Sequence, residues 1–377
     1  MTSLLETEDE TMLRDAARGF LTDASPVKAM RENRDKGRAY DPGLWREMAQ
    51  MGWAGVLIPE EQGGSDMGHR AAGILSEEMG TVLAASPFLS TAVMAAVTLR
   101  HSASDRARQA LLQIAEGGVT YAFAVDEGAK HNPAGTALQA EKSGNAFRLS
   151  GVKTFVADGS TADRLLVLAR TGGTSGESVG LTLFDIDATR TGITRETRPT
   201  VDSRDHSCIT LENVEATGED IVGDLDAGLV TLRRGLEAGQ AALAAELAGV
   251  AGGAYGMTVG YLKERKQFDR TIGSFQALQH RAAHLFSEIE VTASAIINAG
   301  RVLDATPEEA TLAVSLAKAR ATATAKLAVS EGVQMHGGIG MTDEYDIGFY
   351  MKRARVGAEW LGDYGYHAAQ VAAARGF

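Results

Sequence analysis

The chain changes its hydrophobic period twice, and this double change limits the folds open to it. In the first third, apolar residues such as Leu13, Ala16 and Phe20 recur at helical spacing. From Val119 onward apolar and polar residues alternate, as they do in half-buried strands. After about Gly223 the chain returns to long stretches rich in alanine and leucine. The sequence therefore predicts a helical region, an antiparallel β region and a second helical region, in that order.

The positions of these changes divide the chain into three predicted domains. They are an N-terminal α-helical domain over 1–117, a central β domain over 118–223 and a C-terminal helical domain over 224–377. The strands expected in the central domain lie at 119–125, 147–156, 164–169 and 179–186. The helices expected in the last domain lie at 229–263, 275–302 and 308–333, each long enough for a four-helix bundle. The predicted fold class is α+β.

Composition and charge argue against several classes of protein. Forty-nine acidic and 37 basic side chains leave a net charge of −12 over 377 residues, which argues against a protein that coats nucleic acid or a basic protein of the membrane surface. The single cysteine, Cys208, cannot form an internal disulfide. Acidic residues at 6 and 8–10 stand where a signal peptide would be basic and then apolar, and no apolar run approaches the ~18–20 residues of a membrane span. We expect a cytoplasmic protein that binds neither nucleic acid nor membrane.

The sequence contains none of the common motifs for nucleoside triphosphates, zinc or serine hydrolysis. There is no P-loop, no CxxC, no HExxH and no Gly-x-Ser-x-Gly. No metal site is predicted.

A glycine-rich segment follows the last long predicted helix. It runs Gln334-Met335-His336-Gly337-Gly338-Ile339-Gly340. Such a turn can bring bare backbone N–H groups against a phosphate or a ribose. The alternative is a plain helix C-cap followed by a turn, with His336 packed or solvated.

Two further segments carry side chains suited to a flat, phosphorylated ligand. Arg265 to Arg270 places charged groups around Phe268, before Phe275-Gln276 opens another helix, and the arginine fork suits a pyrophosphate. The alternative is a solvated helix end, favoured by the helix dipole. Phe155, in a predicted strand, could stack on a flat ring or simply belong to the core.

Taken together, these segments resemble the acyl-CoA dehydrogenase family. The resemblance covers the helix–β–helix order of the whole chain and four ordered segments, namely 52–64, 265–268, 275–276 and 334–340. It implies a flavoprotein that oxidises the Cα–Cβ bond of a coenzyme A thioester, with FAD as hydride acceptor and an electron-accepting flavoprotein as partner. It also implies an oligomer of this chain, or of this chain with a related one, in which subunits share each flavin.

The resemblance assigns the flavin contacts residue by residue. The positions that would reach the nucleotide end of a flavin seated mainly in a neighbouring subunit are retained: Arg265, Phe268, Gln276, Gln334, Gly337 and Gly338. Phe155 takes the position that stacks on the flavin ring. Three positions that carry hydroxyls in the family hold Val125, His131 and Ala157 instead. The half of the predicted site that faces the flavin ring therefore lacks three hydroxyl hydrogen-bond donors.

The carboxylate base is missing from both positions that the family uses. Removing the α-proton of a thioester needs a positioned carboxylate, yet the usual position holds Leu361 and the second one holds Gly239. Glu237 lies roughly 200° around the helix from Gly239 and is expected to point away. Asp363 and Glu359 flank Leu361, and Asp363 is our candidate for a substitute base. The alternative is that all three acids lie on the surface.

These observations leave three functional hypotheses. The first is a subunit of an acyl-CoA dehydrogenase complex whose related partner chain carries the base. In support of it, segments 86–89 and 361–363 resemble paired dehydrogenases that act on bulky acyl-CoA esters such as steroid side chains. The second is a self-sufficient acyl-CoA dehydrogenase that uses Asp363. The third is a flavin-free structural subunit, because a fold alone does not establish chemistry.

Overall fold

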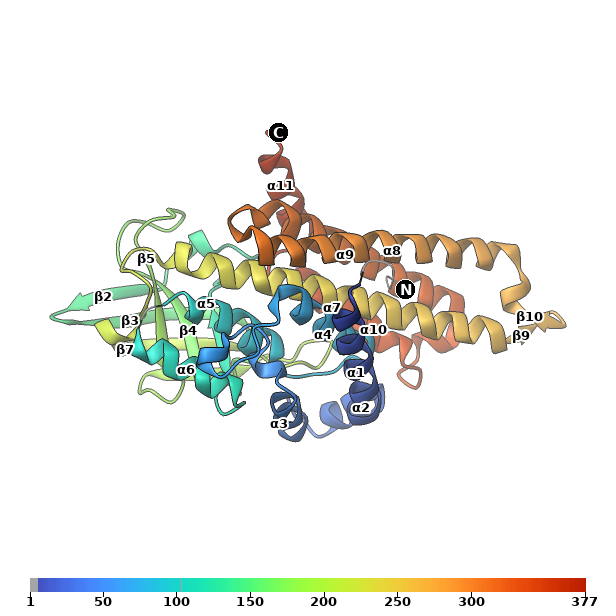
Figure 1. Ribbon diagram of the computed structural model, residues 1–377, viewed down its shortest axis with the longest axis horizontal. Helices are drawn as coiled ribbons and strands as arrows, with labels where there is room; N and C mark the ends of the chain where they lie inside the picture. Colours follow the sequence, from blue (N-terminus) through green and yellow to red (C-terminus); the bar gives the residue numbers. More distant parts are fainter. Residues whose placement is uncertain (1–5, 103) are drawn as a thin grey trace. The chain divides into compact units, whose positions relative to one another are not determined.

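The computed structural model describes residues 6–102 and 104–377 and confirms the predicted order of helices, strands and helices (Figure 1). The α-helices are α1 (Glu8–Ala24), α2 (Val27–Asp35), α3 (Pro42–Gln50), α4 (Gly68–Thr81), α5 (Ala96–Arg100), α6 (Asp105–Ala115), α7 (Gly228–Glu264), α8 (Gln276–Ala305), α9 (Ala310–His336), α10 (Ile347–Glu359) and α11 (Tyr364–Ala374). The strands are β1 (Tyr121–Ala124), β2 (Gln139–Ser143), β3 (Ala146–Ala157), β4 (Arg164–Arg170), β5 (Leu181–Asp187), β6 (Ile193–Thr197), β7 (His206–Thr217), β8 (Ile221–Val222), β9 (Lys266–Gln267) and β10 (Arg270–Thr271). The predicted strands match β1, β3, β4 and β5, and the predicted long helices match α7, α8 and α9.

The chain forms two compact units. Among the described residues, the helical unit contains those up to Glu32, His69–Ala84 and Gln240–Phe377, and the β unit contains Asn33–Gly68 and Ala85–Gly239. Each unit thus gathers segments that are distant in the sequence. The three predicted domain ranges stay a prediction.

The β unit is built on a sheet in the order β6-β7-β3-β2-β4-β5-β8, with β1 also paired to β4. Most neighbours are antiparallel, as predicted, but β1 and β2 both pair with β4 in parallel. The sheet is therefore mixed. Strands β4 and β5 are buried on both faces, which explains their continuous apolar sequences.

The helical unit is held by a core that joins α7, α8, α9 and α10. Its buried members are mainly alanine, valine and leucine, for example Ala245, Ala299, Ala317 and Ala354. α11 follows α10 as a further helix. At the crossing of α4 and α7, a Cβ on Gly80 would lie 2.1 Å from the Glu246 carbonyl oxygen, so only glycine permits this approach.

Among the described helices, α7 is long and apolar enough to cross a membrane by length and composition. However, 67% of its most apolar window is buried inside the structure. This burial is typical of the core helix of a folded domain.

Candidate flavin and acyl-CoA site

The segment after α7 forms a short projecting hairpin. Gln267 pairs with Arg270, and the two residues between them, Phe268 and Asp269, have φ of 55° and 60°. Two consecutive positive φ angles define a type I′ turn, which usually selects asparagine and glycine. The Phe268 side chain is nevertheless 85% exposed at the tip. The hairpin holds a large apolar side chain in a strained conformation and in contact with solvent.

The base of the hairpin is rigidified by aromatic and cationic contacts. The Phe268 and Phe275 rings meet edge to face with centroids 6.1 Å apart, and the Arg270 guanidinium lies 4.0 Å from the Phe275 ring centroid. Gln276 begins α8 and is exposed, as is Arg265. Within the described part of the chain, neither the Arg265 nor the Gln276 side chain has a hydrogen bond or ion pair. Both remain available to a ligand.

The glycine segment ends α9 in a conformation that side chains do not favour. Gly337 has φ 66° and ψ −142°, a region that is essentially restricted to glycine. A Cβ on Gly337 or Gly338 would meet no atom within 4 Å. The backbone there is open, and Gln334 is exposed one helical turn earlier.

An aromatic cluster joins the glycine segment to the hairpin. The His336 ring stacks on Tyr261 at 4.5 Å and lies 4.8 Å from the Tyr345 ring. Tyr261 also accepts, through its carbonyl oxygen, the Arg265 backbone N–H at 2.9 Å. Burial lowers the pKa of His336, whose Nδ1 is 2.6 Å from the Gly332 carbonyl oxygen. We call the assembled set Arg265, Phe268, Gln276, Gln334, Gly337 and Gly338 the flavin arm.

Phe155 stands at a β-bulge in the β unit. Lys153 pairs with Ile209 and Val156 with Ser207, so two residues of β3 oppose one residue of β7. Phe155 has φ 51° and is 62% exposed. A bulge re-aims a side chain in this way, so Phe155 is not a core residue. An outward aromatic ring fits the predicted stacking role.

The loop at 125–132 lies beside this bulge and is held by a buried lysine. Lys153 Nζ donates to the Val125 carbonyl oxygen at 2.8 Å and to Glu127 Oε1 at 2.7 Å. Burial lowers the pKa of Lys153 to about 8, against the opposing effect of Glu127. Glu127 also accepts the backbone N–H groups of Ala137 and Leu138. The Glu127 carboxylate of the loop thus pairs with the buried Lys153 ammonium.

The other polar groups of this loop are also engaged within the chain. His131 Nδ1 lies 2.8 Å from Asp126 Oδ2, and its side chain is 1% exposed. Asp126 also accepts the Asn132 backbone N–H at 2.9 Å. Val125 and Ala157 are buried. At the three positions where the resemblance predicts hydroxyls, the chain has two buried apolar side chains, Val125 in the loop and Ala157 at the end of β3, and one imidazole that is already paired.

Leu361 lies in a tight turn between α10 and α11. It has φ 58° and is 4% exposed. Its carbonyl oxygen accepts hydrogen bonds from Gln240 Nε2 at 3.2 Å and from His367 Nε2 at 3.0 Å. Gln240 directly follows Gly239 in α7. The sequence analysis missed these partners, because nothing local in the sequence marks residues that meet only in the fold.

The acids considered as substitutes occupy three different environments. Glu359 is exposed and pairs with Arg355 at 3.2 Å. Asp363 is half-buried and caps α11 by accepting the Tyr366 backbone N–H at 2.8 Å. The alternative that all three acids lie on the surface is wrong for Glu237, which is only 6% exposed and pairs with Arg233 at 3.1 Å.

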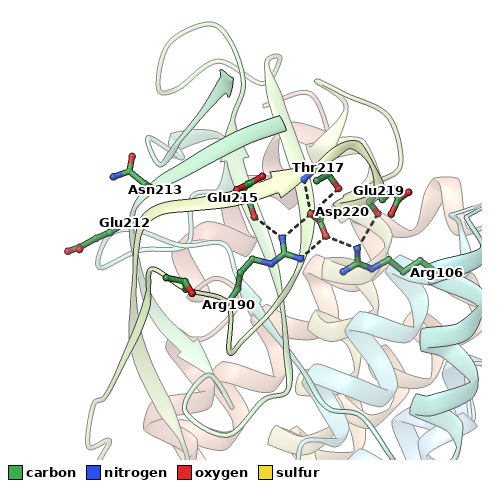
Figure 2. A pocket seen from close by; sticks show the side chains of 9 residues that line it. Arg106, Arg190, Glu212, Asn213, Glu215, Thr217, Glu219 and Asp220 are labelled. Carbon is green, nitrogen blue, oxygen red and sulfur yellow. Dashed lines mark hydrogen bonds and ion pairs between the residues drawn. The ribbon is translucent and has the colours of Figure 1, made fainter. Parts of the chain in front are cut away.

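The β unit contains a cavity of about 730 Å³ (Figure 2). None of the predicted site residues lines it. Arg106 and Arg190 point at Asp220 from two sides, at 2.6 and 2.9 Å. Burial raises the pKa of Asp220, but Arg190, the Thr217 N–H and Arg106 together lower it to about 2. Three further carboxylates line the cavity. Because the two arginines are engaged and the lining is acidic overall, the cavity does not suit a phosphate group.

Comparison with known proteins identifies the family. The acyl-CoA dehydrogenase N-terminal domain matches residues 7–118, and the C-terminal domain matches residues 226–375. The acyl-CoA dehydrogenase IpdE2 of Mycolicibacterium smegmatis is 30% identical, with 94% of this chain and 95% of the relative covered. The chain belongs to the acyl-CoA dehydrogenase family.

Two other relatives resemble this acyl-CoA dehydrogenase over nearly its whole length. A 3-(aryl)acrylate reductase of Clostridium sporogenes is 30% identical, with 94% of this chain and 95% of the relative covered. The structure of the steroid ACAD Tcur3481-Tcur3483 superimposes with a TM-score of 0.87 at 30% identity, covering 97% of each chain. Family members are FAD-binding oxidoreductases that act on CH–CH groups.

The residues present fit FAD in one half of the predicted site and not in the other. The flavin arm has exposed arginine and glutamine side chains and an open glycine backbone, which fit a pyrophosphate and nucleotide. Val125 and His131 of the loop at 125–132 and Ala157 at the end of β3 carry no hydroxyl. The loop carboxylates are engaged, Asp126 with His131 and Glu127 with Lys153 of β3. The arm therefore carries all the residues predicted for it, whereas the predicted ring-facing half has Phe155 and lacks the predicted hydroxyls.

Proposed function

We propose that this chain is one subunit of a two-chain acyl-CoA dehydrogenase. It would contribute the flavin arm to a flavin whose base and ring-side hydroxyls belong to a related partner chain. The observation that carries the proposal is the contrast between the intact, exposed arm and the buried leucine at residue 361, the usual base position. Gly239, at the second base position, has no side chain to offer.

Each residue of the proposed site has a distinct role. The Arg265 guanidinium binds the flavin pyrophosphate, and the Gln276 and Gln334 amides hydrogen-bond the nucleotide. Gly337 and Gly338 let backbone N–H groups approach it. Phe155, aimed outward by its bulge, stacks on a flat ring.

The proposed substrate is a bulky acyl-CoA ester such as a steroid side-chain thioester. The support comes from segments 86–89 and 361–363 of the sequence and from the likeness to a steroid ACAD. Because a flavin that accepts a hydride must release two electrons before the next turnover, an electron-accepting flavoprotein is the proposed further partner. The lone, unpaired Cys208 supports a cytoplasmic location for this assembly.

Co-expression tests the subunit assignment. The chain would be purified alone and together with a candidate partner, an acyl-CoA dehydrogenase-like chain that carries a carboxylate at the base position, and both samples would be assayed for flavin absorbance and for acyl-CoA oxidation. We expect flavin and turnover only in the mixture. A yellow, active homo-oligomer of this chain would refute the proposal, and a colourless, inactive pair would support the flavin-free structural subunit.

A substitution in the pair separates a partner-supplied base from the self-sufficient alternative. Asp363→Asn removes the carboxylate but keeps the α11 cap, since asparagine caps helices as well as aspartate. If the partner supplies the base, turnover should not change. If Asp363 is the base, kcat should fall by roughly 10²–10⁴-fold. Glu359→Gln, which removes the exposed carboxylate on the other side of Leu361, is the matched control and should leave turnover unchanged under both hypotheses.

A further inference from the structure

The turn at residues 360–362 keeps an unfavourable backbone although it has no base to position. A left-handed conformation costs a non-glycine residue roughly 1–2 kcal/mol. Such strain persists where surrounding groups over-determine it, and it often marks a functional position. Leu361 meets this description, with φ 58° and a side chain that is 4% exposed.

Three buried side chains from three helices hold the turn. Gln240 of α7 and His367 of α11 both donate to the Leu361 carbonyl oxygen, as described above. Lys318 of α9 donates through Nζ to the carbonyl oxygens of Gly357 at 3.0 Å and Gly362 at 3.1 Å. These three side chains are 6%, 0% and 0% exposed, in the order Gln240, His367 and Lys318.

Lys318 makes the contacts that span the turn. Gly357 lies in the last turn of α10, where carbonyl oxygens lack helical partners, and Gly362 lies beyond Leu361. A third contact of Nζ, at 3.4 Å, is with Thr322 Oγ1. An ammonium group has three N–H donors and Lys318 has three acceptors, so its protonated form satisfies all of them.

We propose that Lys318 is a positioning residue that, with Gln240 and His367, locks residue 361 in its left-handed conformation, and that the lock loosens when the Lys318 ammonium loses a proton. A neutral amine makes uncharged hydrogen bonds, which are roughly half as strong as those of an ammonium group, so its hold on the Gly357 and Gly362 carbonyl oxygens weakens. The proposal goes beyond the subunit assignment and does not depend on it, because the lock lies wholly within this chain.

The surroundings of Lys318 allow this proton to be lost near neutral pH. Burial lowers the pKa of Lys318 to about 7, while Asp363 and Glu359 act in the opposite direction. The buried charged or titratable side chains on the neighbouring helices include His367 of α11, Tyr350 of α10 and the Glu246–Arg353 pair, which joins α7 to α10 at 3.2 Å. Lys352 and Arg355 of α10 and Tyr366 of α11 are more exposed.

Fluorine NMR of the full chain labelled with 5-fluorotryptophan tests the lock, because Trp360 directly precedes Leu361. The chain has three tryptophans, and Trp360→Phe assigns the reporter resonance. We expect this resonance to shift in one step near pH 7 in the wild type. Lys318→Met should abolish the step.

Two control variants separate the lock from neighbouring titrations. His367→Gln keeps a donor for the Leu361 carbonyl oxygen but does not titrate, and Lys326→Met removes an exposed lysine of the same helix. Both should retain the step. A step that persists in Lys318→Met, or that disappears in His367→Gln, would overturn the proposal.

Hydrogen exchange provides a readout that does not depend on titration. At pH 6, Lys318→Met should speed amide exchange of residues 360–363 by at least about tenfold relative to the wild type, with exchange in α8 unchanged. If Lys318→Met does not fold, Gln240→Met removes one donor to the Leu361 carbonyl oxygen and should raise exchange in the same segment. Unchanged exchange in that segment would contradict the lock.

Discussion

The flavin arm and the loop at 125–132 differ in whether their polar side chains are already paired within the chain. In the arm, the Arg265, Gln276 and Gln334 side chains are exposed and have no hydrogen-bond or ion-pair partner among the described residues. In the loop, Glu127 pairs with the buried Lys153 and Asp126 pairs with His131. The arm can therefore bind a ligand without first breaking internal contacts.

This difference matches the predicted division of the site into a half with free polar side chains and a half without hydroxyls. Replacing hydroxyls by Val125 and Ala157 removes donors, and the remaining polar groups of the loop stabilise the loop itself. A buried charge left unpaired costs several kcal/mol, so these internal pairs are not readily exchanged for ligand contacts. Four substitutions or titrations, taken from the largest expected effect to the smallest, test the contrast.

Breaking the internal pairing of the loop should have the largest effect. Glu127→Ala leaves the Lys153 ammonium buried without its carboxylate and should lower the free energy of unfolding by about 3–5 kcal/mol. Chemical denaturation measures this loss. Glu141→Ala, which removes an exposed carboxylate from β2, is the control and should change stability by less than about 0.5 kcal/mol. Equal effects of the two variants would show that the pairing is unimportant.

Straining the arm should have a smaller effect on stability. Gly337→Ala forces a side chain into a glycine conformation and should cost about 1–3 kcal/mol. Gly338→Ala places a Cβ in equally open space without the positive φ, so it should cost less. Thermal unfolding of both variants compares them. A Gly338→Ala variant as unstable as Gly337→Ala would indicate that space, rather than backbone conformation, limits this turn.

Lys153, the buried β3 lysine that pairs with the loop, should affect how the free energy of unfolding depends on pH. The pKa of Lys153 is about 8 in the folded chain, against an ordinary lysine value of 10.5 that applies once the chain unfolds. Between these values the unfolded state binds more protons, so this group makes stability rise with pH from about 8 to 10.5. Denaturation at several pH values should show a shallower rise in Lys153→Met. If the slope of stability against pH were unchanged in Lys153→Met, another group would be responsible for the rise.

The hairpin tip should show the smallest effect on stability. Phe268→Gly relieves a positive φ but removes the edge-to-face contact with Phe275, so the two effects oppose each other and the free energy of unfolding should change by less than about 1 kcal/mol. The same variant should weaken flavin retention in the two-chain complex. Phe268→Tyr keeps the ring and should retain flavin. A larger loss of stability in Phe268→Gly would mean that the ring contributes more to packing within its own chain than its exposure indicates.

Much of the fold could be predicted from the sequence because it depends on local periodicity. Helices α7, α8 and α9 and strands β1, β3, β4 and β5 lie where the apolar spacing placed them. Strands β2, β6, β7 and β8 were missed, and the parallel pairing of β1 and β2 with β4 was not foreseen. Strand pairing depends on contacts across the sheet, which a local pattern does not encode.

For the site, the sequence determined which chemical groups are present: Arg265 and Gly337 stand at predicted flavin positions, and the two predicted base positions hold Leu361 and Gly239, which have no carboxylate. Only the tertiary structure decided how these residues are held. Gln240 and Leu361 are 121 positions apart, yet they share a hydrogen bond, and the Lys318 ammonium meets its acceptors only when α9, α10 and the turn pack together. The identity of each side chain can be read from the sequence position by position, whereas its burial and its hydrogen-bond partners depend on contacts between distant segments.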